Sequence, residues 1–288
     1  MSLKNPIKFP VKFYSWQDTD APLLEDVDGC IKTILKACLV NGYGDKEGAG
    51  WTMPFEDDYR MIVRRPLRTG NPPDIKIENG VTNGTATHRI VAQDNPTGLD
   101  DSNELSATFL HARDSKCGQQ WYVLATDFAC MLFYEMAENG YTTPGKMAML
   151  YIGSAKKIFD TDNEYHLMNY FSSIRQSGLL LNWGKGIFAD SNVGFINQVT
   201  GDKYTHPKFL DLNIDEKING GYLAQPIVIG EKVVLPFMTA LTDNIDNNNW
   251  GKIMIDGRPF LRCNNRYRYD IHGYGVRVIY TPMDYWEL

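Results

Sequence analysis

The sharpest chemical motif in this 288-residue sequence is a glycine-rich run that ends in lysine, residues 140–146 (GYTTPGK). Its G-x-x-x-x-G-K spacing is that of a loop that binds the phosphates of a nucleotide. Such a loop needs a serine or threonine next, to hold magnesium, and then a helix whose N-terminus faces the phosphates. Met147 takes the serine or threonine position, and residues 149–152 are typical of a strand. The sequence therefore favours a plain hairpin loop over a nucleotide site.

Histidine and serine chemistry is not indicated by spacing. The five histidines form no H-E-x-x-H or H-x-x-x-H pair; they are His88, His111, His166, His206 and His272. A zinc site would have to be assembled entirely by the fold, and isolated polar residues on strands or loops are the commoner explanation. No G-x-S-x-G elbow occurs, and Ser154 after Gly153 lacks the flanking glycine. We predict no catalytic, cofactor-binding or metal-binding residue.

Paired carboxylates occur in three expected loops: Asp57 with Asp58, Asp100 with Asp101, and Asp160 with Asp162. A glycosidase needs two carboxyl groups about 5–10 Å apart across a cleft, often far apart in the sequence. Solvated loop charge is the commoner explanation for such pairs. Glycan cleavage therefore stays open as an alternative.

Arginines gather in two places. Residues 64–68 (RRPLR) form the first group, and Arg258, Arg262, Arg266, Arg268 and Arg277 form the second, which interleaves with Tyr267, Tyr269 and Tyr274. Arginine and tyrosine together can stack on sugars or bases. In an acidic protein they more often mark a protein interface. We therefore expect an oligomer contact or a docking surface.

Composition limits the classes of function. Apolar residues make up 43% of the chain and charged residues 22%, which indicates a folded globular protein. The net charge of −6 provides no general attraction for nucleic acid or an anionic membrane. The five cysteines are odd in number and form no C-x-x-C pair, which predicts a reducing compartment of synthesis. We expect neither an export signal nor a membrane span.

One stretch near the start, residues 20–55, predicts a helix and the turn that follows it. Asp20 is expected to cap a helix of residues 21–40, with Pro22 in its first turn. Asn41 and Gly42 provide a left-handed stop. One apolar face is predicted by spacings of three and four, with Leu39 alongside: Leu24, Val27, Ile31, Leu35 and Cys38.

Strand candidates follow each other through most of the chain, with Asn-Gly turn signals between several of them. They cover residues 11–16, 59–64, 75–78, 88–92, 106–112, 120–125, 129–136 and 146–152. Strands without intervening amphipathic helices predict an antiparallel meander and exclude a parallel α/β sheet. Residues 164–174 predict a short helix, with Leu167, Tyr170, Phe171 and Ile174 on one face.

Two hairpins are predicted near the C-terminus, before a last strand at residues 277–280. Residues 227–234 turn at Gly230-Glu231 (type II′), and residues 253–262 turn at Asp256-Gly257 (type I′). The predicted fold class is α+β, predominantly antiparallel β with one well-defined N-terminal helix packed on a sheet. We predict an N-terminal α+β domain of residues 4–160 and a C-terminal β-rich domain of residues 161–288.

The first stretch also carries a resemblance. Residues 20–23 (DAPL), 36–44 (KACLVNGYG) and 49–55 (AGWTMPF) resemble the N-terminal segment of uncharacterised virion structural proteins of tailed bacteriophages and prophages. Residues 121–134 and 144–153 look similar as well, and the chain from Gly251 on matches only in outline. Relatives tend to have an aromatic-Gly-Asp turn before the Pro-Gly loop, where this chain has residues 138–141 (ENGY).

The resemblance implies a non-enzymatic virion component of the tail or its baseplate, made in the bacterial host cytoplasm. Its implied partners are other phage tail proteins and further copies of itself, without cofactor, nucleic acid or membrane. The family offers no catalytic residue to transfer. The alternative is a tail-associated carbohydrate-binding protein or glycan hydrolase that contacts a host surface glycan.

Overall fold

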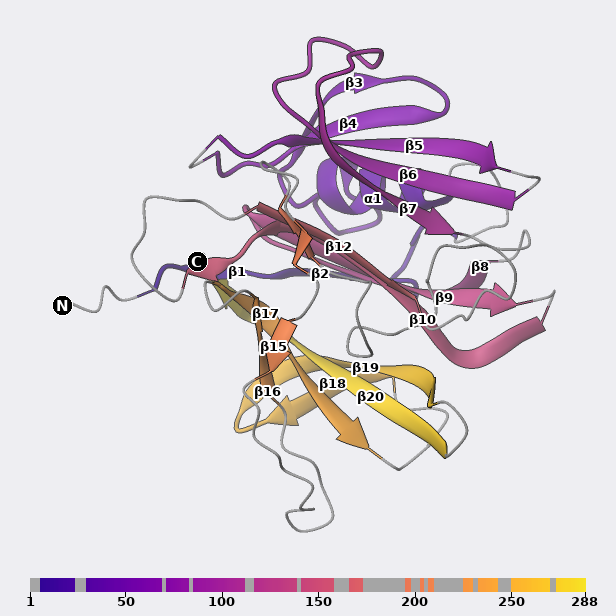
Figure 1. Cartoon of the computed structure of the whole chain (residues 1–288), viewed down its shortest axis with the longest axis vertical. Helices are drawn as coiled ribbons and strands as arrows, with labels where there is room; N and C mark the ends of the chain where they lie inside the picture. The colour runs from indigo at the N-terminus through magenta and orange to yellow at the C-terminus, as the bar shows by residue number, and fades with distance from the viewer. Residues whose placement is uncertain are drawn as a thin grey trace.

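The computed structural model describes residues 6–23, 30–68, 71–82, 85–111, 117–138, 141–157, 166–172, 195–197, 203–204, 207–209, 225–229, 233–242, 250–269 and 273–288. Strands make up 56% of the chain and pair antiparallel, which confirms the predicted fold class. They form three large sheets stacked as layers, and both termini lie at the same side (Figure 1).

The first layer, which we call the helix-side sheet, has the order β3-β4-β5-β6-β7. Its strands follow one another along the chain as the predicted meander does. They are β3 (Thr52–Glu56), β4 (Arg60–Arg64), β5 (Asp74–Thr82), β6 (Thr85–Gln93) and β7 (Glu104–His111).

The middle layer, the central sheet, has the order β14-β13-β12-β10-β9-β8-β2. The meander prediction did not separate this sheet from the first one. Its strands are β2 (Lys12–Ser15), β8 (Cys117–Ala125), β9 (Ala129–Glu138), β10 (Tyr141–Ser154), β12 (His166–Ser172), β13 (Phe195–Asn197) and β14 (Lys203–Tyr204).

The third layer, the C-terminal sheet, has the order β15-β16-β17-β20-β19-β18, and β11 (Lys156–Lys157) pairs with β17 beside it. Its other strands are β15 (Pro207–Phe209), β16 (Gln225–Ile229), β17 (Val233–Thr242), β18 (Gly251–Ile255), β19 (Arg258–Tyr269) and β20 (Gly273–Pro282). A separate ribbon pairs β1 (Lys8–Pro10) with β21 (Tyr285–Glu287), near the two termini.

The central sheet is buried on both faces at residues 121–125, 129–134 and 149–154, and these stretches are nearly continuously apolar. Trp121, Val123 and Leu132 belong to a core that includes the helix and the helix-side sheet. Tyr122 and Phe133, which alternate with them, belong to a second core that includes the C-terminal sheet. Two cores thus share one sheet, and each side of its pleat fills one of them.

The helix lies between the helix-side sheet and the central sheet (Figure 1). It is described as α1 (Cys30–Lys36), which continues as a π-helical turn, η1 (Ala37–Asn41). The predicted apolar face is confirmed where it is described, and Ile34 joins it; the buried residues are Ile31, Ile34, Leu35, Cys38 and Leu39. Leu24 and Val27 lie outside the described residues.

The predicted helix start is wrong. Asp20 has a φ of 58° in a turn, and residues 21–23 are irregular, so no helix begins directly after Asp20. The backbone of this segment instead binds the central sheet, where Trp121 Nε1 donates to Pro22 O at 3.0 Å. The helix stop is confirmed, since Gly42 has a φ of 79° and its N–H donates to Ala37 O at 2.8 Å.

The loop after the helix closes the outer edge of β2, the end strand of the central sheet. Lys46 Nζ donates to Phe13 O at 2.8 Å, and Ser15 N donates to Asp18 Oδ2 at 2.7 Å. Lys46 and Asp18 are themselves an ion pair, with 2.5 Å between Nζ and Oδ2. Side chains therefore occupy backbone groups that another strand would otherwise use.

The hairpin at Asp256-Gly257 is confirmed. Ile255 pairs with Arg258, and the two turn residues have φ of 47° and 77°, as a type I′ turn requires. The first hairpin also forms, but Ile229 pairs with Val233, one residue beyond the predicted register. Its turn lies outside the described residues. The last predicted strand is part of β20.

The predicted helix at residues 164–174 is wrong where it is described, because His166–Ser172 form strand β12. β12 pairs with β10 over seven residues, for instance Leu150 with Tyr170. Strand pairs also cross the predicted domain boundary at 160/161: β10 with β12, β11 with β17, and β1 with β21. The division into two domains stays a prediction.

Candidate functional site

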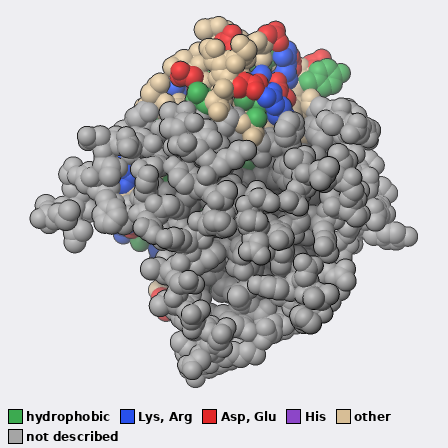
Figure 2. Space-filling view, in the orientation of Figure 1, with side chains coloured by type: hydrophobic (Ala, Val, Ile, Leu, Met, Phe, Trp, Pro, Cys, Tyr) green, Lys and Arg blue, Asp and Glu red, His purple; other side chains and the backbone are tan. Residues whose placement is uncertain are grey.

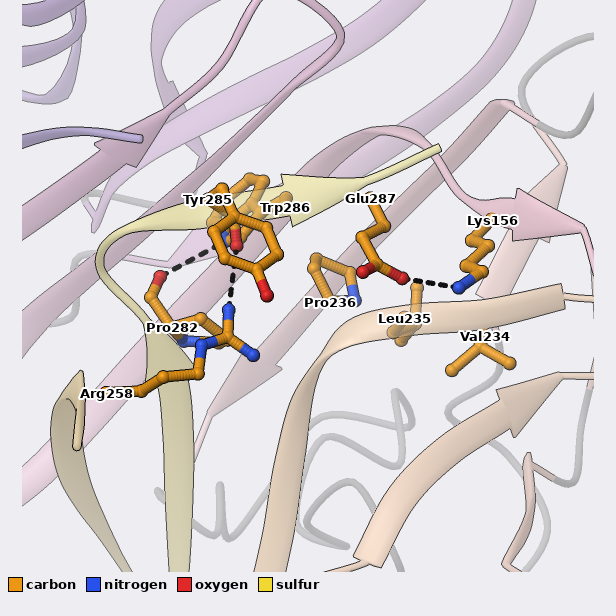
Figure 3. Close-up of a pocket in the computed structure, with 9 residues that line it drawn as sticks. All are labelled: Lys156, Val234, Leu235, Pro236, Arg258, Pro282, Tyr285, Trp286 and Glu287. Atoms are coloured by element: carbon orange, nitrogen blue, oxygen red, sulfur yellow. Dashed lines mark hydrogen bonds and ion pairs between the residues drawn. The ribbon is translucent and has the colours of Figure 1, made fainter. Parts of the chain in front are cut away.

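A small cleft of about 190 Å³ lies where β17 leaves its neighbours. β11 pairs with β17 at Val233 and Val234, and β20 pairs with it from Met238 onward. Residues 235–237 have no register partner on any described strand; they lie between the pairs that β17 makes with β11 and with β20, and beside a register shift in its pairing with β16. Figure 3 shows the walls of this cleft: Lys156, Val234, Leu235, Pro236, Arg258, Pro282, Tyr285, Trp286 and Glu287.

The C-terminal segment forms one wall because Pro282 ends β20 and the chain returns as β21. Trp286 is fully buried in the second core and its Nε1 donates to Pro282 O at 3.0 Å (Figure 3). Pro236 has no N–H to donate, which suits a position where β17 has no partner. The floor of the cleft is thus apolar and fixed by a buried indole.

Charged groups surround Tyr285 at the rim. Arg258 donates to Asp284 through Nε at 2.9 Å and Nη2 at 2.8 Å, and its guanidinium lies 4.2 Å from the Tyr285 ring centroid. Lys8 Nζ lies at the same distance from that centroid. The hydrogen bonds with Asp284 raise the pKa of Arg258, and Arg258 holds the pKa of Asp284 below its usual value. Both groups stay charged at neutral pH.

A second ion pair crosses the mouth of the cleft, between Lys156 Nζ and Glu287 Oε2 (Figure 3). The cleft therefore offers an apolar floor between two cations that already have carboxylate partners. No wall residue is a cysteine, serine, threonine or histidine. Lys156 and Glu287, two wall residues whose types can transfer protons, bind each other, so the cleft is suited to holding a small group.

The structure places the phosphate-loop candidate in a strand. Residues 141–154 form β10, with a register shift between Thr142 and Met147, and no helix follows Lys146. The loop is also shorter than predicted, because Tyr141 already pairs with Glu138. Gly140 lies outside the described residues. A strand at this position lacks the helix N-terminus that a phosphate-binding loop requires.

The predicted basic patch at residues 64–68 is not a free positive surface. Arg64 and Arg68 both bind the fully buried carboxylate of Asp74, at 2.6 and 2.7 Å. Arg65 is buried and donates to Pro73 O at 3.2 Å, and burial lowers its pKa to about 10. The cluster therefore binds groups near the start of β5 within this chain, and it does not present free charges to another molecule. In the second group, Arg266, Arg268 and Arg277 have side chains outside the described residues.

The candidate carboxylates take structural roles where they are described. Asp57 and Asp100 both bind Arg60, at 2.7 and 2.6 Å, and Asp101 accepts a hydrogen bond from Thr97 Oγ1 at 3.0 Å. Figure 2 shows acidic and basic side chains intermixed over this part of the surface, around the helix-side sheet. Asp160 and Asp162 lie outside the described residues.

Buried histidine and cysteine are likewise structural. His88 is buried, with Nδ1 2.8 Å from Asn79 Oδ1. The other four histidine side chains are not described. Cys38, Cys130 and Cys263 are free and buried, and burial raises the pKa of Cys130 to about 12, so its thiol stays protonated. Within the described part of the chain no cluster of histidine, cysteine or carboxylate side chains is suited to a metal ion.

Sequence reasoning missed the cleft. No sequence pattern marks Lys156. Pro282 and Trp286 are recognisable only as a proline and a large aromatic residue near the C-terminus, which does not indicate a site. No helix among the described residues is long and apolar enough to cross a membrane. Comparison of the chain with protein families, with curated proteins and with solved structures found no match.

Proposed function

We propose that this chain is a structural protein of a tailed phage or prophage virion, a tail or baseplate component that acts by protein–protein assembly. The proposal rests on the resemblance of residues 20–55 to virion structural proteins. Under it, the chain is made in the bacterial host cytoplasm and ends in the virion tail. Its partners are other tail proteins and further copies of itself.

One observation carries the proposal beyond the resemblance: the described part of the resembling stretch acts as an anchor between two sheets. Trp51 is buried, its backbone N–H donates to Leu39 O, and its Nε1 donates to Thr126 O at 3.0 Å. Lys32 and Lys36 both bind Glu56 on β3, at 3.0 and 2.7 Å. A stretch with these contacts maintains a scaffold, which is what a particle component requires.

The described charges support the same proposal. Arg60, Arg64, Arg68, Arg89 and Arg258 each bind a carboxylate of this chain. Exposed ion pairs of this kind contribute little to stability, but they give each of these arginines a partner within this chain. A β-rich scaffold of three layers with paired surface charge suits assembly with symmetry.

The test is a mass-spectrometric inventory of phage particles purified from an induced lysate. We expect the chain in purified virions, at a constant ratio to known tail proteins. If the chain is found free in the lysate but is absent from purified particles, the proposal is contradicted.

The second candidate, a tail-associated carbohydrate-binding protein or glycan hydrolase, is favoured only by the cleft with Tyr285 on its wall. The two cations against that ring compete with a stacked sugar. Incubation of the purified protein with the host surface polysaccharide distinguishes the outcomes. Release of reducing ends indicates an enzyme, and retention without release indicates a binder. If neither is observed, assembly remains the proposed function.

A further inference from the structure

The edge strands of the three sheets differ in how far they are protected from another strand. The outer edge of β2 is occupied by Lys46 and Asp18, as described above. β3 contains Pro54 and a register shift between Thr52 and Phe55, both of which hinder pairing. β18 has neither device, and among the described strands its only neighbour is β19.

The register of the β18–β19 hairpin fixes which backbone groups point to the free edge. In a two-residue hairpin the closing pair, Ile255 with Arg258, exchanges hydrogen bonds, and so does every second pair after it. The pair of Met254 with Pro259 is therefore a non-bonded one, which agrees with Pro259 O accepting from Met283 N on the other side. The N–H and C=O groups of Lys252 and Met254 consequently face outward.

The side chains on β18 leave this edge open. Met254 is 66% exposed, so this chain leaves its apolar side chain uncovered. The ammonium of Lys252 lies 4.7 Å from the ring centroid of Phe13 on β2, so its charge is in contact with an aromatic ring of this chain. A Cβ at Gly251 would meet no atom within 4 Å. A further strand could approach this edge.

We infer that β18 pairs antiparallel with β18 of a second copy of this chain, about a two-fold axis at Ile253. In this register Lys252 lies opposite Met254 of the partner copy, and both outward residues exchange hydrogen bonds with their opposites. Gly251 lies opposite the partner's Ile255, which covers the open space beside the glycine. The two C-terminal sheets become one continuous sheet across the axis.

Two neighbouring registers are less favourable. An axis at Lys252 places the two lysines directly opposite each other, which costs free energy through like-charge repulsion. An axis at Met254 places Lys252 opposite Asp256, but Asp256 belongs to the turn, with a φ of 47°, and cannot continue a ladder. Only the axis at Ile253 overlaps all five residues of β18.

Residue 254 tests the pairing and its register together. Sedimentation velocity of the full-length protein over a range of concentrations should show a reversible monomer–dimer equilibrium. Met254→Lys places a lysine opposite the partner's Lys252, which gives the dimer two like-charge pairs and should weaken it by up to ~tenfold. Met254→Glu removes the same methionine but places a carboxylate there, and should retain or strengthen the dimer.

Cysteine cross-linking provides a second measurement that does not depend on affinity. At a two-fold axis the Cα atoms of residue 253 would lie about 4.5 Å apart, which a disulfide can span. Ile253→Cys should therefore give a covalent dimer under mild oxidation, whereas Met254→Cys should not exceed the wild-type background. Both variants must keep the wild-type melting temperature to be compared.

Three results would overturn the inference: a wild-type chain that stays monomeric at every concentration, equal weakening by lysine and glutamate at position 254, or stronger cross-linking at 254 than at 253. The inference deepens the proposed assembly role by naming a contact surface. Its failure is distinguishable from failure of that role, because pairing is measured on purified protein and virion membership on particles.

Discussion

The carboxylate of Asp18 accepts hydrogen bonds from a lysine, a tyrosine and the backbone. Lys46 Nζ lies 2.5 Å from Oδ2, Tyr43 Oη 2.8 Å and Ser15 N 2.7 Å. Burial raises the pKa of this carboxyl group, but the hydrogen bonds from Lys46 and Tyr43 outweigh burial and hold the pKa below its usual value. The ionised form is therefore the one that stabilises the fold.

Asp18→Asn should lower the free energy of unfolding at neutral pH by about 1–3 kcal/mol, because it removes a charged acceptor of several hydrogen bonds. The folded pKa lies below the unfolded value of about 3.9. The stabilisation is thus fully present above roughly pH 4 and is lost as the pH falls through the lowered folded pKa. Urea unfolding of both proteins across this range measures the difference.

The control is Asp45→Asn, which changes an exposed carboxylate next to Lys46 in the loop after the helix and should leave stability within about 0.5 kcal/mol of wild type. A difference between wild type and Asp18→Asn that stays constant from neutral pH to the acid limit would contradict this account.

The sequence alone shows where arginines gather, but not what each arginine does. Arg64, Arg65 and Arg68 form a basic run in the sequence. In the structure Arg64 and Arg68 bind Asp74, and Arg65 is buried. Asp74 lies in β5, whose pairing with β4 brings the partners together. That pairing is a tertiary fact, which one-dimensional spacing does not contain.

At the scale of elements, the end of the helix depends on one glycine. Gly42 has a φ of 79°, and a Cβ there would lie 2.2 Å from Lys46 O. Gly42→Ala must therefore move the loop that carries Lys46 away from β2. We expect a loss of more than about 1–2 kcal/mol in the free energy of unfolding, from backbone strain together with this displacement.

Gly98→Ala is the matched control, because a Cβ at Gly98 meets nothing within 4 Å. Its unfolding free energy should stay within about 0.5 kcal/mol of wild type. Guanidinium titration of the two variants, followed by tryptophan fluorescence, provides the comparison. Equal effects at the two glycines would show that Gly42 does not restrain the loop.

Local signals predicted elements well, and long-range pairing decided the rest. The Asp256-Gly257 turn was predictable because both residues tolerate positive φ and the flanking strands are adjacent in sequence. Residues 164–174 were not, because Leu167, Tyr170 and Phe171 fit a helical face as well as a buried strand, and pairing with β10 selects the strand. The π-helical turn after Lys36 depends on the bond from Gly42 to Ala37, which no helical spacing indicates.

At the scale of the whole molecule, the central sheet explains why the layers and the cleft escaped prediction. Residues 121–125 and 129–134 are apolar on both faces of this sheet, so their sequence does not say which neighbour covers which face. The cleft needs β11, β17 and β21 to meet, although they are separated by more than 100 residues of chain between Lys156 and Glu287. Only the closed fold brings these segments to one place.

The same sheet decides whether residues 4–160 can fold alone. Without the C-terminal sheet, the face with Tyr122, Leu124 and Phe133 would lose its described cover, which includes Leu235 and Leu261. An uncovered apolar face of this kind favours aggregation. We therefore expect residues 4–160, expressed alone, to aggregate or to bind a hydrophobic dye, and the full chain to unfold in one transition by circular dichroism and by tryptophan fluorescence. A soluble fragment with native-like spectra, together with two separate transitions in the full chain, would instead establish two domains that fold independently, and the central sheet would then be stable with one face exposed to water.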